Sequence, residues 1–137
     1  MKSFKEFLAD KTIGLIEPIA IFVSRGPNFG TYSAKVDSGN DGYNVLNAPD
    51  LKVENEVAYF KILDGKQVGI KVTEYIDVHI GDDNIDHRPV VSLDVKFNGK
   101  QYKDIKFSLA NRESNDNPVL ISKEFIKKLG LLIDVNK

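Results

Sequence analysis

Two runs of alternating apolar and polar residues, joined by the dipeptide Asn98-Gly99, constrain the fold of this chain most strongly. Alternation with a period of two is typical of a strand that buries one face and exposes the other. Asn-Gly tolerates the positive φ angles that a two-residue hairpin turn requires. The apolar positions of the two runs are Val91, Leu93, Val95, Phe97, Ile105, Phe107 and Leu109. The pattern predicts a β-hairpin at this point of the chain.

Further short strands are predicted before this hairpin. Asp64-Gly65 separates apolar runs at residues 57–62 and 68–72, which predicts a second hairpin. Alternation resumes at residues 76–80 and ends in the loop sequence of residues 81–84. Many short strands joined by tight turns favour a mainly β fold, in the form of a small closed or partly open barrel.

One helix is predicted, close to the C-terminus. Residues 118–121 have the apolar character of a short buried strand, and Ser122 follows them as a suitable helix N-cap. Gly130 is a suitable helix stop because glycine adopts the left-handed conformation at the end of a helix. The sequence therefore predicts a C-terminal helix over residues 123–129 and a last strand at residues 131–135.

The first 17 residues differ from the rest of the chain. Phe4, Phe7 and Leu8 have the spacing of a narrow apolar stripe on a short helix. Pro18 then separates this segment from the first predicted core strand, at residues 19–23. We therefore expect an amphipathic N-terminal arm over residues 1–17 and a single β domain over residues 18–137.

Composition limits the partners and the location of the protein. Hydrophobic residues make up 42% of the 137 residues and charged residues 28%, as in a globular domain. Nineteen basic and twenty acidic side chains give a net charge of −1, so we expect no nucleic acid or membrane surface as a partner. No apolar run reaches the roughly 18 residues of a membrane span, and the N-terminus lacks the features of a signal peptide. We expect a cytoplasmic location.

The tripeptide Asp37-Ser38-Gly39 is the candidate functional motif. It follows the predicted strand at residues 31–36, so an apolar strand delivers a carboxylate into a sharp turn, as in an aspartic peptidase. The same three residues also make an ordinary turn, because Asp and Ser bind nearby backbone amides and Gly adopts positive φ. Acid-base catalysis needs two carboxylates that share a proton. Since the tripeptide occurs once, catalysis predicts a homodimer with Asp37 near its two-fold axis.

Five segments in order along the chain resemble one family. They are residues 34–39, 87–91, 107–112, 117–125 and 132–135. In order and spacing they are similar to the retropepsin-like family described as ATP-dependent zinc proteases, and the resemblance covers residues 18–137. It implies a small β-barrel of the kind that forms one lobe of an aspartic peptidase, with one C-terminal helix. It also implies that the strand at residues 118–121 packs beside the catalytic loop and leads into the helix.

The resemblance also implies site residues. Asp37 matches the catalytic acid, Ser38 the hydroxyl residue that bonds across the dimer in retropepsins, and Gly39 the turn residue. The chain departs from the family pattern at Asn40, where a small Ala is usual, and at Ser122-Lys123, where Gly-Arg is usual. Added bulk beside loops that must approach each other favours a non-catalytic protein.

No metal or cofactor is predicted, despite the family's description. His79 and His87 flank Asp82, Asp83 and Asp86, but the spacing matches neither a zinc helix nor a calcium loop. A solvated acidic loop, with His87 paired to a nearby Asp, accounts for them. No glycine-rich phosphate loop is present, so we expect no ATP site. The sequence has no Cys and therefore no Cys-based zinc site.

Two functions remain open. In the first, the chain is an aspartic endopeptidase that acts on protein or peptide as a homodimer, with the hairpin around Asp64-Gly65 as a flap. In the second, the same barrel is a catalytically inactive binding or structural module, such as a head, neck or tail component of a bacteriophage virion. Residues 1–8 resemble the first residues of tailed-phage proteins, and Leu15-Ile16-Glu17 resembles a prohead-protease site. The second function places the protein in the virion, assembled with other subunits.

Overall fold

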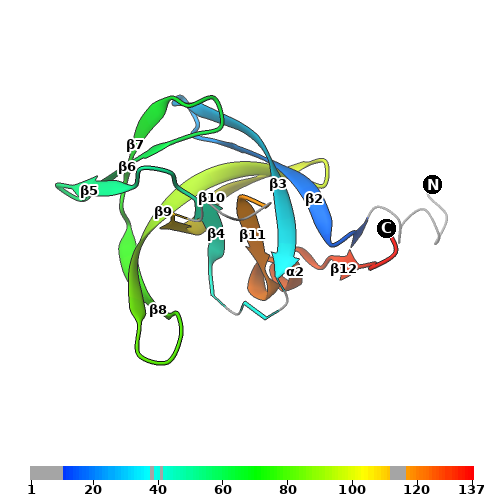
Figure 1. The fold of residues 1–137 in the computed structure, drawn as a ribbon. Coiled ribbons are helices and arrows are strands. Elements are labelled where there is room, and N and C mark those ends of the chain that lie inside the picture. The colour runs from blue at the N-terminus through cyan, green and yellow to red at the C-terminus, as the bar shows by residue number, and fades with distance from the viewer. Residues whose placement is uncertain (1–10, 38, 41, 112–116) are drawn as a thin grey trace.

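The computed structural model describes residues 11–37, 39–40, 42–111 and 117–137. The described part is mainly β, as the sequence predicts, with a single helix near the C-terminus (Figure 1). The elements are β1 (Thr12–Ile13), β2 (Ile16–Phe22), β3 (Asn28–Asp37), β4 (Asn44–Asn47), β5 (Lys52–Glu54), β6 (Val57–Lys61), β7 (Gln67–Lys71), β8 (Glu74–His79), β9 (Ile85–Phe97), β10 (Lys100–Ala110), β11 (Val119–Ser122), α2 (Lys123–Leu129) and β12 (Leu132–Ile133).

Seven strands form the main sheet, in the order β10-β4-β11-β3-β2-β9-β8. β10, at one end of this order, also pairs with β9, the strand next to the other end. Most neighbours are antiparallel, but β4 runs parallel to β10 and β11 runs parallel to β3. β5, β6 and β7 form a separate three-stranded sheet, which Figure 1 shows at the opposite end of the molecule from the loop after β3.

Both predicted hairpins are confirmed. Phe97 pairs with Lys100 across the first turn, and Asn98 and Gly99 have φ angles of 51° and 78°. β6 and β7 form the second hairpin, with Gly65 at a φ of 85°. The sequence did not predict the irregularity in β10 between Tyr102 and Ile105.

The predicted C-terminal helix is also confirmed. The side chain of Ser122 accepts a hydrogen bond from the backbone of Phe125, and Gly130 ends the helix with a φ of 66°. β12 is shorter than the predicted strand, since it contains only Leu132 and Ile133. It pairs in parallel with β1 and does not join the main sheet.

The first core strand begins earlier than the sequence suggests. The sequence predicts a start at Ile19, but β2 begins at Ile16. Pro18 lies inside the strand and pairs with Ser33 of β3. A proline is tolerated there because β9 pairs with β2 only from Ile19 onward, so the missing N–H faces no other described strand. Ile13 of β1 is fully buried. The predicted helix at residues 4–8 lies outside the described residues.

The core lies between the strands of the main sheet and extends under the small sheet. Phe29 and Phe60 join the two sheets, with ring centroids 5.8 Å apart in an edge-to-face arrangement. α2 adds Phe125, whose ring meets the rings of Phe97 and Tyr102. Within the described ranges, no helix is long and apolar enough to cross a membrane.

Candidate functional site

Asp37 is the last residue of β3 and lies beside the start of the helix. β11 runs parallel to β3, and the register pairs Asp37 with Ser122. Ser122 is the last residue of β11 and the N-cap of α2. The helix therefore begins directly beside the Asp37 carboxylate. This confirms the expectation that the strand at residues 118–121 lies beside the Asp37 loop and leads into the helix.

Backbone hydrogen bonds fix the loop after Asp37. The amide of Gly39 donates to Asp37 Oδ1 at 3.2 Å, and the amide of Asn40 donates to the Asp37 carbonyl at 3.1 Å. The Asn40 carbonyl in turn accepts from the amide of Lys123 at 3.0 Å, which ties the loop to α2. Gly39 is exposed at the turn, as predicted. Ser38 lies outside the described residues.

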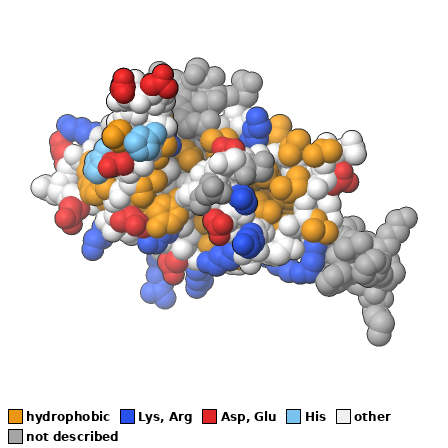
Figure 2. Space-filling view, turned by 90° about the horizontal axis from the view of Figure 1, so that it is seen from below, with side chains coloured by type: hydrophobic (Ala, Val, Ile, Leu, Met, Phe, Trp, Pro, Cys, Tyr) orange, Lys and Arg blue, Asp and Glu red, His pale blue; other side chains and the backbone are white. Residues whose placement is uncertain are grey.

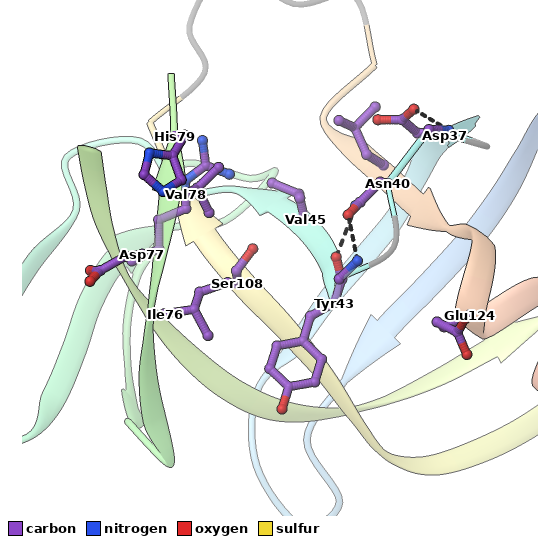
Figure 3. Close-up of a pocket in the computed structure, with 14 residues that line it drawn as sticks. Asp37, Asn40, Tyr43, Val45, Ile76, Asp77, Val78, His79, Ser108 and Glu124 are labelled. Atoms are coloured by element: carbon purple, nitrogen blue, oxygen red, sulfur yellow. Dashed lines mark hydrogen bonds between the residues drawn. The ribbon is translucent and has the colours of Figure 1, made fainter. Parts of the chain in front are cut away.

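Asn40 uses its side chain within its own loop (Figure 3). Its Nδ2 donates to the Tyr43 carbonyl at 3.0 Å, and its Oδ1 accepts from the amide of Gly42 at 2.9 Å. The larger side chain of Asn40, which departs from the family pattern, therefore forms hydrogen bonds that close its own loop. A small residue at this position would leave two backbone groups without these partners.

The Asp37 loop opens into a pocket of about 850 Å³. Four aliphatic side chains from three strands, β4, β8 and β11, make part of its wall: Val45, Ile76, Val78 and Leu120. No ion pair joins Asp37 to another residue in the described part of the chain. The Asp37 carboxylate is half-buried and lies at the edge of a pocket of the size that small ligands and peptides occupy.

Ser108 contributes a buried hydroxyl to the same pocket. The residue is 1% exposed, and its register partners are Val45 on β4 and Val90 on β9. Its Oγ forms no hydrogen bond to another residue that the structure describes, and in Figure 3 it lies between Ile76 and Val45. Sequence reasoning missed Ser108 because the alternation placed it on a polar face.

The β8–β9 hairpin forms the wall opposite Asp37, which corrects the predicted flap. β8 contributes residues 76–79 to the pocket lining and β9 contributes Arg88, whereas the hairpin around Asp64-Gly65 contributes none of the lining residues. Figure 1 shows why, since β6 and β7 lie at the opposite end of the molecule. The two hairpins have similar patterns of strand and turn residues in the sequence. Which of them lines the pocket depends on the long-range pairing of β9.

The two histidines lie on the β8–β9 hairpin, and Figure 2 shows them with acidic and apolar side chains beside them. His87 Nδ1 lies 2.6 Å from Asp77 Oδ1, which confirms the expected pairing of His87 with an Asp. The His87 ring also stacks on Tyr75, with centroids 4.9 Å apart. Among the described residues, no three His, Cys, Asp or Glu side chains come together in a way that could hold a metal ion.

A second polar group lies at the start of the hairpin, and one of its members, Tyr43, also lines the pocket. Tyr43 and Lys106 both donate hydrogen bonds to Glu74. These bonds, from Lys106 first and then from Tyr43, hold the pKa of the Glu74 carboxyl below its usual range. The same contacts raise the pKa of the Tyr43 hydroxyl and of the Lys106 ammonium. Glu74 therefore stays ionised in mildly acidic solution.

The fold is similar to that of a protein of unknown function in a crystal structure. That protein is Lpg0085 from Legionella pneumophila, described as of unknown function (DUF785), with a TM-score of 0.68 and 22% sequence identity. The match covers 92% of this chain and 94% of that chain, so the architecture is shared along almost the whole length of both. At this identity the similarity shows the fold alone. No protein-family model matches the chain, and no curated protein matches its sequence.

Proposed function

We propose that the chain is a retropepsin-like aspartic endopeptidase that works as a homodimer, with one Asp37 from each subunit. The observation that carries the proposal is the position of Asp37. It ends β3 beside the parallel strand β11, and it faces a hairpin across an apolar pocket. A peptide chain held between loop and hairpin would meet the carboxylate at its backbone.

The strand pairings support the barrel part of this proposal. β10 pairs with β4 and with β9, so the pairing runs through β10, β4, β11, β3, β2 and β9 and returns to β10. A sheet whose two end strands pair has the connectivity of a small barrel. β8 then extends from β9 outside this circuit and reaches the pocket.

One subunit supplies one of the two carboxylates that hydrolysis by this mechanism requires. Two carboxylates held close together share one proton, because both cannot stay ionised. The ionised member takes a proton from water as the water oxygen bonds to the peptide carbonyl carbon, while the protonated member donates its proton to the carbonyl oxygen. The carboxyl group that took the water proton then gives it to the amide nitrogen, and the other carboxylate takes a proton from one hydroxyl of the tetrahedral intermediate. The C=O bond re-forms, the C–N bond breaks, and the pair again shares one proton. A second Asp37 across a two-fold axis supplies the missing carboxylate.

Substitution of Asp37 tests this function. We expect Asp37→Asn to lower the hydrolysis of a peptide library at mildly acidic pH by about 10²–10⁴-fold, because the amide cannot act as acid or base. Asp50→Asn is the matched control, since Asp50 is remote from the pocket and its φ of 57° suits Asn. Circular dichroism should show the same fold for all three proteins. Equal hydrolysis by wild type and Asp37→Asn would contradict the proposal.

A second candidate function, a non-catalytic peptide-binding or virion module, is supported by a different observation. The pocket is large, with aliphatic side chains in its wall, and the Asp37 loop brings one carboxylate to it, whereas hydrolysis requires a closely spaced pair. Under this candidate the wild type and Asp37→Asn bind peptides alike, and neither cleaves them. The library experiment therefore separates the two functions.

A further inference from the structure

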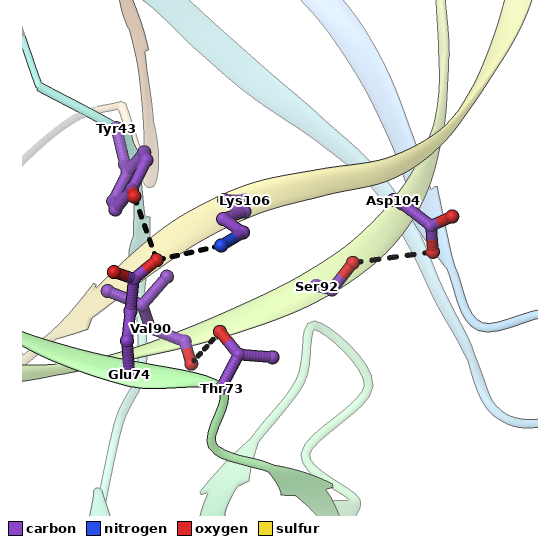
Figure 4. A network of polar contacts seen from close by, with 7 residues as sticks. All are labelled: Tyr43, Thr73, Glu74, Val90, Ser92, Asp104 and Lys106. Carbon is purple, nitrogen blue, oxygen red and sulfur yellow. Dashed lines mark hydrogen bonds and ion pairs between the residues drawn. The ribbon is translucent and has the colours of Figure 1, made fainter.

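Two side chains from different parts of the fold meet at one carboxylate oxygen of a third (Figure 4). Tyr43 Oη and Lys106 Nζ each donate a hydrogen bond of 2.8 Å to Glu74 Oε1. Lys106 Nζ also lies 5.7 Å from the centroid of the Tyr43 ring. Tyr43 precedes β4, Glu74 is the first residue of β8, and Lys106 belongs to β10. A single carboxylate thus links three elements.

Tyr43 connects this carboxylate to the Asp37 loop. The Tyr43 carbonyl accepts a hydrogen bond from Asn40 Nδ2, and the Asn40 amide donates to the carbonyl of Asp37. Two hydrogen bonds therefore separate Tyr43 from the backbone of Asp37. A shift of Tyr43 moves the loop that presents the carboxylate.

Glu74 lies at the base of the β8–β9 hairpin. It pairs with Val90, whose carbonyl accepts hydrogen bonds from both the amide and the hydroxyl of Thr73. Beyond this point β8 pairs with β9 and with no other described strand. A two-stranded ribbon is only marginally stable by itself. Contacts at its base therefore have a large influence on where it lies.

The other ion pairs of the hairpin do not fix it to the rest of the molecule. His87 pairs with Asp77, and Arg88 Nε pairs with Asp86 at 2.7 Å. Each of these pairs joins two residues of the hairpin, so they stiffen it internally. The contacts of Glu74, in contrast, reach residues outside it.

We infer that Tyr43, Glu74 and Lys106 form a clasp that holds the β8–β9 hairpin over the Asp37 loop and sets how far the pocket opens. They are positioning residues, because they act through the hairpin and the loop. The effect of the clasp on hydrolysis rests on the proposed function. Its effect on the hairpin follows from the contacts alone.

Hydrogen exchange of the full chain, followed by mass spectrometry, tests the clasp directly. Glu74→Gln removes the charge with little change of shape, and Tyr43→Phe removes only the hydroxyl. We expect each to accelerate amide exchange in residues 40–44 and 74–90 by roughly two- to fivefold, as for loss of an exposed charged contact. In the double variant, exchange should accelerate by a smaller factor than the product of the two single-variant factors. The two effects are not independent, because both substitutions remove a contact at the same Glu74 oxygen.

Glu54→Gln is the matched control. Glu54 is exposed on β5 and pairs with Lys52 at 2.7 Å, so the same substitution breaks a similar ion pair far from the pocket. Exchange in residues 40–44 and 74–90 should stay at the wild-type rate. Unchanged rates there in Glu74→Gln and Tyr43→Phe would overturn the clasp, and so would an equal acceleration along the whole chain.

Peptide hydrolysis provides the second readout. If the clasp positions the hairpin for catalysis, Tyr43→Phe lowers kcat/KM by the same factor by which it accelerates exchange. Asp37→Asn, in contrast, lowers hydrolysis by about 10²–10⁴-fold and leaves exchange in residues 74–90 unchanged. If the wild type cleaves no peptide, the proposed function fails and exchange alone decides the clasp.

Discussion

Individual polar side chains in this fold are placed by neighbours that lie far away in the sequence. Asp94 and Ser108 both occupy polar positions of the alternating runs, where the pattern predicts exposure. Both are buried, with 9% and 1% of their surface exposed. Alternation shows which side of a strand faces the core, but it does not show whether other elements cover the second side. Ser24 covers Asp94, and β4 flanks Ser108.

Asp94 stabilises the fold through three hydrogen bonds. Its Oδ2 accepts from the hydroxyl and the amide of Ser24, at 2.6 and 3.2 Å, and its Oδ1 accepts from the amide of Asp104 at 3.1 Å. The last bond holds the irregular segment of β10, where Asp104 has a φ of 56°. Asp94 therefore ties the loop after β2 to β10.

We predict that Asp94→Asn lowers the free energy of unfolding by about 1.5–3 kcal/mol at pH 7, because hydrogen bonds to a charged group are lost. Urea denaturation measures the difference. Asp82→Asn, in the exposed loop after β8, should change it by less than about 0.5 kcal/mol. An equally small change for Asp94→Asn would contradict the structural role of this carboxylate.

The same carboxylate gives a pH dependence with a definite sign. The Ser24 hydroxyl is the main cause that holds the pKa of Asp94 below its ordinary value, and the amides of Asp104 and Ser24 add to it. The stabilisation is therefore complete above the ordinary Asp pKa of about 3.9. It is lost as the pH falls through the lower folded-state pKa. The stability difference between wild type and Asp94→Asn should shrink below about pH 4.

At the scale of elements, the sequence predicted those turns and helix ends that a few neighbouring residues determine. The Asn98-Gly99 turn and the helix caps at Ser122 and Gly130 are short patterns with a direct conformational cause. The early start of β2 and the role of the β8–β9 hairpin were not predicted. Among the described strands, the first residues of β2 pair with β3 alone, and the long-range pairing of β2 with β9 begins only at Ile19. That pairing joins segments about 75 residues apart, so no single stretch of sequence contains it.

The end of α2 offers a test of one such local signal. Gly130 has a φ of 66°, and a Cβ there would meet nothing within 4 Å, so a substitution has a conformational cost but no clash. We expect Gly130→Ala to lower the free energy of unfolding by about 1 kcal/mol, and Gly130→Asn by less, because Asn tolerates the left-handed region better. Thermal denaturation compares the three proteins. A neutral Gly130→Ala would mean that α2 does not end as described.

At the scale of the whole molecule, the sequence predicted a mainly β fold with one C-terminal helix, and the local position of part of the candidate site. It placed Asp37 and Gly39 in a sharp turn at a strand end, which the structure shows beside a pocket. It missed Ser108 and the clasp residues Tyr43, Glu74 and Lys106, because these come together only when β4, β8 and β10 are assembled. The second carboxylate that the proposed function requires belongs to another copy of the chain, so neither the sequence nor a single subunit shows it.

The separation of the two Asp37 carboxylates in the assembled protein is the most direct measurement of the central claim. A crystal structure at mildly acidic pH provides it. We predict a two-fold axis beside β3, with the carboxylates of the two subunits within hydrogen-bonding distance, about 2.5–3.0 Å. A monomer, or a dimer whose axis leaves the two Asp37 carboxylates far apart, would contradict the account.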